Sequence, residues 1–171
     1  MPGSFIRRFT ALCLLAATSL ATADSGRSLS FFHTHTGETL TVRYWSNGAY
    51  DPAALEEINT FLADWRDGER VDMDPELLDA LHAIREAAGS EGTFEVISAY
   101  RSPQTNEMLR SRSNGVASKS QHLLGKAIDV RLRGVDTARL RDVALALGLG
   151  GVGYYGSSDF IHVDTGRVHR W

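Results

Sequence analysis

Two short runs in the C-terminal half of the chain carry ionisable residues among β-branched ones, and this pattern constrains the fold more than any other feature. In "AIDV", residues 127–130, Asp129 stands between two β-branched residues, and His162 does the same in "DFIHVD", residues 159–164. Alternate side chains of a strand point to opposite faces, so His162 and Asp164 share one face while their apolar neighbours take the other. A polar group in such a strand is costly without a partner, and a shared cation would serve both strands.

A third candidate ligand, His122, precedes Asp129 by seven residues in "SKSQHLLGKAIDV", residues 118–130. Gly125 lets the chain turn after His122, and the following strand aims Asp129 at the same point. A catalytic zinc site uses three ligands of the histidine and carboxylate kind and keeps a fourth position open. His122, Asp129 and His162 would form such a set. Hydrogen bonds between buried histidine and aspartate would satisfy the same spacing, which leaves a structural cluster without metal as an alternative.

The patterning of apolar residues predicts an α+β fold with a small, mainly antiparallel sheet flanked by helices. Strand signals are runs of β-branched and aromatic residues bounded by glycine-containing turns. Helix signals are apolar residues at helical spacing, which begin at Asp51-Pro52, at about Pro75, at Ser102-Pro103 and at Asp136. The predicted elements are a hairpin over 28–45, helices over 51–67, 75–88, 102–110 and 136–147, a strand over 93–100, and two strands around a turn at 156–158.

Two further histidines, His33 and His35, fall in the predicted hairpin and alternate on one strand face. They could be metal ligands, but no third partner lies near them in the sequence. We therefore interpret them as hairpin side chains.

The first 23 residues predict a secretory signal peptide that is removed from a single domain over 24–171. Arg7 and Arg8 precede a short apolar run, and the run ends near the triplet Ala21-Thr22-Ala23. The run is too short for a transmembrane helix, so we expect no stable membrane anchor, although an uncleaved anchor and either export route stay open. Cleavage removes the single cysteine, Cys13, and changes the formal charge from -3 to -5. Disulfides and nucleic-acid binding are not expected.

Three segments together resemble the zinc D-alanyl-D-alanine metallopeptidases, which have the hedgehog-like fold, and within them the murein endopeptidase K subgroup. These segments are "ISAYRS", "SKSQHLLGKAIDV" and "GGVGYYGSSDFIHVDTG". The resemblance extends from the "HTGE" hairpin to Trp171. It implies one Zn2+ per chain, in a cleft on the sheet, with His122, Asp129 and His162 as ligands.

The resemblance also implies roles for four other residues. Arg101 matches an arginine that faces the scissile carbonyl oxygen, with a salt bridge from the strand end to the following helix as the alternative. Ser120 matches a serine that binds substrate, although a local turn hydrogen bond is an alternative. Many relatives place the general base three residues before the last histidine, where Asp159 stands here. The subgroup pattern favours Asp164, which could instead orient His162.

A secreted protein of this family is expected to hydrolyse peptide bonds in peptidoglycan, in the periplasm or at the cell wall. An aspartate would take a proton from water, and Arg101 and zinc would polarise the amide carbonyl. The resemblance favours an endopeptidase over a carboxypeptidase, while the residues do not choose between a D,D and an L,D bond. A zinc-containing module of the same fold that binds the cell wall without cleaving it is the alternative.

Overall fold

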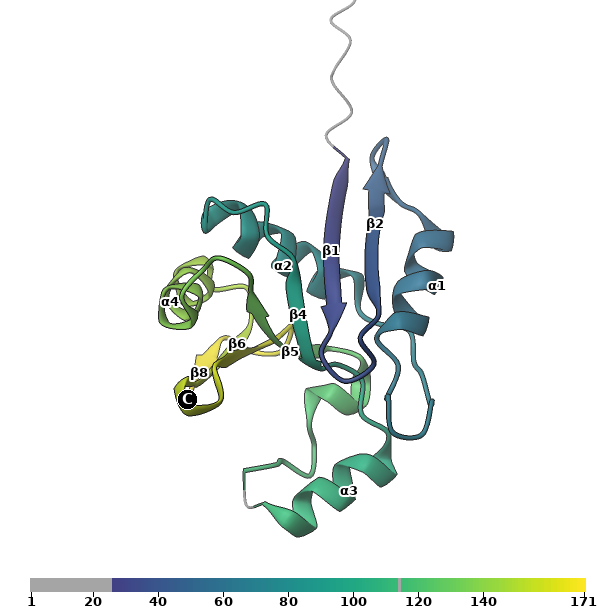
Figure 1. Ribbon diagram of the computed structural model, residues 1–171, viewed down its shortest axis with the longest axis vertical. Coiled ribbons are helices and arrows are strands. Elements are labelled where there is room, and N and C mark those ends of the chain that lie inside the picture. Colours follow the sequence, from purple (N-terminus) through teal and green to yellow (C-terminus); the bar gives the residue numbers. More distant parts are fainter. Residues whose placement is uncertain (1–25, 114) are drawn as a thin grey trace, which may run out of the picture.

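The computed structural model describes residues 26–113 and 115–171, and in this part of the chain one sheet connects all of the strands (Figure 1). The predicted signal peptide lies outside the described residues. The strand order is β3-β2-β1-β4-β5-β7-β6-β8. The strands are β1 (Arg27–His33), β2 (Thr39–Ser46), β3 (Ala49–Tyr50), β4 (Phe94–Ser98), β5 (Ala127–Leu132), β6 (Gly151–Tyr155), β7 (Phe160–Asp164) and β8 (His169–Arg170).

The sheet is mixed and has eight strands within residues 26–113 and 115–171, so the predicted α+β class is confirmed while the expectation of a small sheet is corrected. Neighbouring strands are antiparallel except in the pairs β1–β4 and β6–β8, which are parallel. Parallel neighbours need a crossover connection, and the two helices between β2 and β4 provide one. The two-residue strands β3 and β8 are too short to give a periodic signal in the sequence.

Four α-helices accompany the sheet in the described residues: α1 (Pro52–Phe61), α2 (Pro75–Ala87), α3 (Pro103–Arg112) and α4 (Thr137–Leu147). Each begins where the sequence predicted, and the side chains of Asp51, Asp74, Ser102 and Asp136 accept hydrogen bonds from backbone N–H groups of the first turn. Figure 1 shows α1 beside β2 and α3 beyond the end of β4. Among the described residues, none of the helices combines the length and the apolar character that a membrane crossing requires.

One predicted boundary is wrong, because α1 ends at Phe61 and does not include Trp65. The carboxylate of Asp64 accepts hydrogen bonds from the backbone N–H of Arg66 and of Ser102, and this holds residues 62–68 in turns. Trp65 is therefore 41% exposed and stacks on His35, with ring centroids 4.3 Å apart.

The two hairpin histidines behave as structural side chains. His33 is buried, and its Nδ1 accepts hydrogen bonds from the backbone N–H groups of His35 and Thr36, both at 3.3 Å. His35 lies in the turn after β1 rather than on the strand, so the two do not share a strand face. No group of candidate metal ligands among the described residues includes either histidine.

The core places the polar residues of β5 and β7 on one face of the sheet. Ile128 and Val130 of β5 and Ile161 and Val163 of β7 are buried in the hydrophobic core. Helix α4 packs against both strands and against α2. Because side chains alternate, the residues between these apolar ones point to the opposite face.

The turn after His122 depends on Gly125, which has φ +66°. A Cβ atom on Gly125 would lie 2.7 Å from the carbonyl oxygen of Asp72 and 2.9 Å from Cγ1 of Val71. We predict that Gly125→Ala lowers the free energy of unfolding by at least about 2 kcal/mol, because conformational strain and a steric clash add. Gly134→Ala is the matched control: Gly134 has φ +80° but open space around it, so only strain of about 1 kcal/mol is expected.

Urea denaturation at equilibrium measures both variants. Equal losses of stability in Gly125→Ala and Gly134→Ala would show that the contact with the segment around Asp72 does not constrain this turn.

Candidate metal centre

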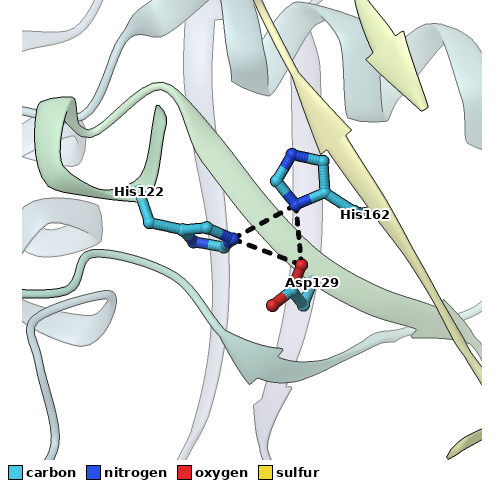
Figure 2. A group of neighbouring side chains, drawn as sticks. All are labelled: His122, Asp129 and His162. Carbon is cyan, nitrogen blue, oxygen red and sulfur yellow. Dashed lines mark hydrogen bonds and ion pairs between the residues drawn. The ribbon is translucent and has the colours of Figure 1, made fainter. Parts of the chain in front are cut away.

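Three elements bring His122, Asp129 and His162 together (Figure 2). His122 lies in the 3-10 helix η1 (Gln121–Leu124), which follows the Ser120 cap and ends at Gly125. Asp129 and His162 are directly opposite each other in the β5–β7 register. All three side chains are buried.

The ligand atoms are close enough to bind one ion. Asp129 Oδ1 lies 2.8 Å from His162 Nδ1 and 3.3 Å from His122 Nε2, and the two histidine nitrogens are 3.1 Å apart. Two ligands about 2.0 to 2.1 Å from a tetrahedral zinc ion are about 3.3 Å apart. The three residues therefore fit one zinc ion with small adjustments.

Hydrogen bonds on the far side of each imidazole fix where its lone pair points. His122 Nδ1–H donates to the carbonyl oxygen of Ala99 at 2.6 Å, so the neutral ring presents the Nε2 lone pair to the cluster. His162 Nε2–H donates to Asp164 Oδ2 at 3.1 Å, so the neutral ring presents the Nδ1 lone pair. With the carboxylate of Asp129, three electron-pair donors converge without a donor proton among them. A cation is the partner that satisfies all three.

Without a cation, a proton can bind between these three groups, and the pKa values of Asp129, His122 and His162 show which of them favours the protonated form. Burial opposes ionisation of Asp129, but the imidazoles of His122 and His162 beside its carboxylate favour the charged form and hold its pKa far below the usual range. Burial lowers the pKa of His122. Burial also acts to lower the pKa of His162, yet its hydrogen bonds to Asp129 and Asp164 outweigh this effect and raise the pKa above its usual value of 6.5.

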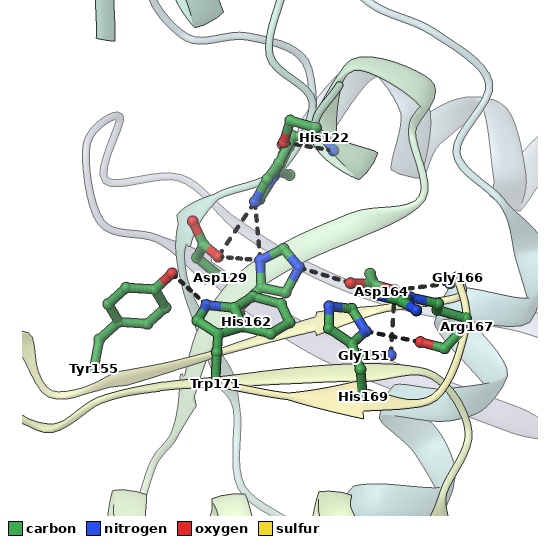
Figure 3. Close-up of polar contacts among 12 residues, drawn as sticks. His122, Asp129, Gly151, Tyr155, His162, Asp164, Gly166, Arg167, His169 and Trp171 are labelled. Carbon is green, nitrogen blue, oxygen red and sulfur yellow. Dashed lines mark hydrogen bonds and ion pairs between the residues drawn. The ribbon is translucent and has the colours of Figure 1, made fainter. Parts of the chain in front are cut away.

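Asp164 lies on the opposite side of the His162 ring from Asp129, as Figure 3 shows. Its Oδ1 accepts hydrogen bonds from the backbone N–H of Gly151 at 3.2 Å and of Gly166 at 2.7 Å. Its Oδ2 accepts the bond from His162, and the residue is buried. The carboxylate of Asp164 is thus hydrogen-bonded to the His162 ring and to two backbone N–H groups.

Asp159 is placed outside this cluster. It caps the 3-10 helix η2 (Gly156–Ser158) in a left-handed conformation, with φ +54°. Its carboxylate accepts hydrogen bonds from Thr137 Oγ1 and from Arg131 Nη1, and its side chain is 63% exposed. It is not among the residues that line the pocket around His162.

Arg101 and Ser120 both line this pocket and both have partners in the protein. Arg101 Nη2 pairs with Asp129 Oδ2 at 2.5 Å, and its Nε–H donates to Ser98 Oγ at 2.9 Å. The salt bridge therefore joins the end of β4 to β5 rather than to the following helix. Ser120 Oγ accepts a hydrogen bond from the backbone N–H of His122 at 3.3 Å, which is the local turn bond that the sequence left open.

A pocket of about 440 Å³ opens over the cluster, a volume typical of small-ligand sites. The predicted residues that line it are Arg101, Ser120, His122, Asp129, His162 and Asp164. The sequence interpretation missed several others: Lys119, Tyr155, Arg167, His169 and Trp171. A signal was available for the last three, because "RVHRW", residues 167–171, gathers basic and aromatic side chains just after the strand that carries His162.

The fold and the site define a class, an α+β protein in which two histidines and an aspartate could hold one metal ion beneath a pocket. The chain belongs to the family described as Peptidoglycan L,D-endopeptidase MepK, whose model matches residues 21–171. This match confirms the family and the subgroup that the motifs suggested.

Individual relatives agree with this assignment. Peptidoglycan L,D-endopeptidase MepK of Escherichia coli (strain K12) is 36% identical over 160 residues, which cover 92% of this chain and 88% of the relative. The same description and identity apply to a protein of Shigella flexneri. Probable peptidoglycan L,D-endopeptidase MepK of Haemophilus influenzae is 39% identical over 154 residues, which cover 90% of this chain and 83% of the relative.

We predict that the affinity for zinc increases with pH and levels off above the raised pKa of His162. The ion needs the Nδ1 lone pair of His162, and at low pH a proton stabilised by Asp129 and Asp164 occupies that atom. Competition with a chromogenic chelator at several values between about pH 5 and 8 measures this, with about one proton released per ion in the lower part of the range. A constant affinity over this range would contradict the assignment of His162 Nδ1 as a ligand atom.

Proposed function

We propose that this chain is an exported, zinc-dependent endopeptidase that hydrolyses peptide bonds in peptidoglycan. We also propose that it cuts the L,D type of bond for which its relatives are named. The observation that carries the proposal is the convergence of three lone pairs, from His122, Asp129 and His162, at the bottom of a pocket. Three protein ligands and an accessible fourth position are the arrangement of a catalytic zinc centre.

When bound there, zinc would supply Lewis-acid chemistry, because it polarises a carbonyl oxygen and lowers the pKa of water. The residues of the chain hold and orient the groups. Arg101 keeps Asp129 in place through Oδ2, and two of its five N–H donors are used in the protein. The guanidinium also lines the pocket, so its remaining donors can reach a substrate carbonyl oxygen and stabilise negative charge on it. Ser120 is proposed to bind substrate through its hydroxyl proton.

Asp164 is proposed to act as a positioning residue for His162. Its carboxylate keeps the proton of the neutral ring on Nε2, which leaves Nδ1 free for the ion. Two backbone N–H groups and His162 hold both of its oxygens away from the position between the three ligands. We propose this role in place of the general-base role that the resemblance favoured. Asp159 would need to leave Thr137 and Arg131 before it could accept a proton in the pocket.

The charge of the pocket favours an anionic peptide as substrate. Lys119 and Arg167 line it, and neither makes an ion pair within residues 26–113 and 115–171. With a divalent cation bound, positive charges outnumber the carboxylates of Asp129 and Asp164. Such a pocket attracts a peptide that carries free carboxylates, even though the whole chain is acidic. Free carboxylates on the peptides of a cell wall would suit this requirement.

The site of action is proposed to be the periplasm or the cell wall. The support comes from the sequence pattern predicted for residues 1–23 and from the relatives, which are named for peptidoglycan. No stable membrane anchor is expected after cleavage.

A zinc-containing cell-wall binding module is the second candidate, and one observation favours it. Asp164 lines the pocket but is hydrogen-bonded to Nε2 of His162, on the side of the ring away from Asp129, and Asp159 lies outside the pocket. Neither predicted base therefore lies among the three candidate ligand atoms. A module needs the pocket and the zinc but no proton acceptor.

His122→Ala tests the proposed function against both alternatives. We predict that the wild-type protein loaded with zinc releases fragments with new amine and carboxylate ends from purified sacculi. His122→Ala should bind little zinc and cleave at least about a hundredfold more slowly, because a ligand of the ion is gone. Mass spectrometry of the digests and elemental analysis of the proteins are the measurements, and His82→Ala, on α2 outside this pocket, is the matched control.

Unchanged muropeptides with retained binding to sacculi would identify the wild-type protein as the binding module. Protein purified without chelators that contains no zinc and cannot take it up would support a purely structural cluster.

Asp164→Asn and Asp159→Asn form a second matched pair. An amide at position 164 can present N–H to His162 Nε2, which would favour the ring tautomer with its proton on Nδ1, toward the ligand cluster. We predict a zinc affinity that is 10- to 100-fold lower for Asp164→Asn, with turnover largely restored by excess zinc. Asp159→Asn should keep the wild-type affinity and turnover.

The two variants also locate the general base. An Asp164→Asn protein that stays inactive with zinc fully bound would show that Asp164 accepts the proton. Loss of turnover in Asp159→Asn with normal zinc content would assign that role to Asp159.

A further inference from the structure

Trp171 is a large apolar side chain that is 51% exposed and yet held in place by several contacts. Its backbone N–H donates to the carbonyl oxygen of Val152 at 3.3 Å, and its carbonyl oxygen accepts from Tyr154 N–H at 3.1 Å. Its indole Nε1–H donates to the hydroxyl of Tyr155 at 2.9 Å. An exposed aromatic ring that is fixed at both backbone and side chain can offer its surface to a ligand with little loss of entropy.

A glycine in β6 makes room for this ring beside the metal centre. Gly153 is directly opposite His162 in the β6–β7 register. A Cβ atom on Gly153 would lie 2.7 to 2.8 Å from three atoms of the Trp171 indole, so the ring rests on the backbone of the strand. The indole centroid is 5.1 Å from that of the His162 ring.

His169 makes a further contact with Trp171, because its ring stacks on the indole with centroids 4.6 Å apart. His169 Nδ1–H donates to the carbonyl oxygen of Arg167 at 2.8 Å, which fixes the orientation of the stacked ring. Figure 3 shows Trp171, His169 and His162 grouped together, with Tyr155 at the indole nitrogen. The ring is thus an apolar wall in a pocket that is otherwise lined mainly by polar and charged side chains.

We propose that Trp171 binds the aliphatic part of the peptide residue next to the scissile bond. The indole packs against the methyl or methylene groups of that residue, while the polar groups of the pocket bind its amides and carboxylates. This contact orients the peptide relative to the metal centre, and it rests on the proposed function. Trp171 is a substrate-binding residue in this assignment, and Gly153 acts through it.

Three variants test the wall: Trp171→Ala, Gly153→Ala and the control Trp65→Ala. Trp65 is a comparably exposed tryptophan, at 41%, that stacks on a histidine in the same way but does not line the pocket. Cross-linked muropeptides purified from sacculi serve as the substrate. We expect kcat/KM to fall about tenfold or more in Trp171→Ala, mostly through KM, with unchanged zinc content. Trp65→Ala should match the wild type.

Gly153→Ala keeps the indole of Trp171 in the protein but moves it from its place on β6. The new methyl group displaces the indole from the strand, so its kinetic effect should resemble that of Trp171→Ala. Circular dichroism and urea midpoints identify any variant that has lost its fold, and Trp171→Phe provides a version with a smaller aromatic surface and an intermediate KM.

Wild-type kcat/KM in a folded Trp171→Ala protein would overturn the proposal, and so would an equal loss in Trp65→Ala. Direct binding of the same muropeptides to zinc-loaded protein separates this proposal from the proposed function. If the wild type binds them without cleaving them, the enzymatic function fails, and weaker binding by Trp171→Ala still supports the wall. Equal binding by wild type and Trp171→Ala would reject it.

Discussion

Three electron-pair donors meet within 3.3 Å beneath the pocket, and their mutual repulsion must be relieved by a proton or a cation. The second hydrogen bond of each imidazole arranges these donors so that they could hold a metal ion. The carbonyl oxygen of Ala99 accepts a hydrogen bond from Nδ1–H of His122, and the carboxylate of Asp164 accepts one from Nε2–H of His162. If either acceptor were lost, that ring could place its proton inside the cluster and satisfy it without an ion. The acceptors therefore decide whether the cluster binds metal or only forms hydrogen bonds.

The sheet provides the precision that such a cluster needs. Asp129 and His162 belong to paired strands whose other faces are buried in the core. A one-residue shift in register would turn apolar side chains out of the core and polar ones into it, so the register is strongly specified. His122 is not on the sheet, and a short 3-10 helix with a serine cap and a left-handed glycine carries it into range. A hydrogen bond from Arg101 N–H to the carbonyl oxygen of His122, at 3.2 Å, connects this helix to the end of β4. The rigid core thus extends to all three ligands.

The sequence predicted those parts that are governed by local rules or by a single strand face. The helix starts at Asp51, Pro75, Ser102 and Asp136 follow local rules, and all four helices begin there to within one residue. The alternation around Asp129 and His162 led to the candidate ligands, which the structure brings together. The parallel pair β1–β4 was missed because it depends on a long-range crossover that leaves no periodic signal. The hydrogen-bond partners of Asp159 and Asp164 could not be predicted from the sequence, because long-range contacts determine them. Asp159 pairs with Thr137 and Arg131, and Asp164 with Gly151.

An aspartate at position 129 does more than a third histidine could. Its Oδ1 faces the two imidazoles, while its Oδ2 pairs with Arg101, whose side chain is only 13% exposed. A histidine could offer a lone pair to an ion, but it would leave the arginine without its carboxylate in a pocket that already gains two positive charges from that ion. Breaking a buried ion pair in this way costs about 3 to 5 kcal/mol. The negative charge of Asp129 would therefore allow a bound cation to lie close to Arg101, and in the proposed reaction the two would polarise a carbonyl oxygen from two directions. Asp129 in "AIDV" thus has two roles, since its negative charge balances Arg101 and its Oδ1 is a candidate metal ligand.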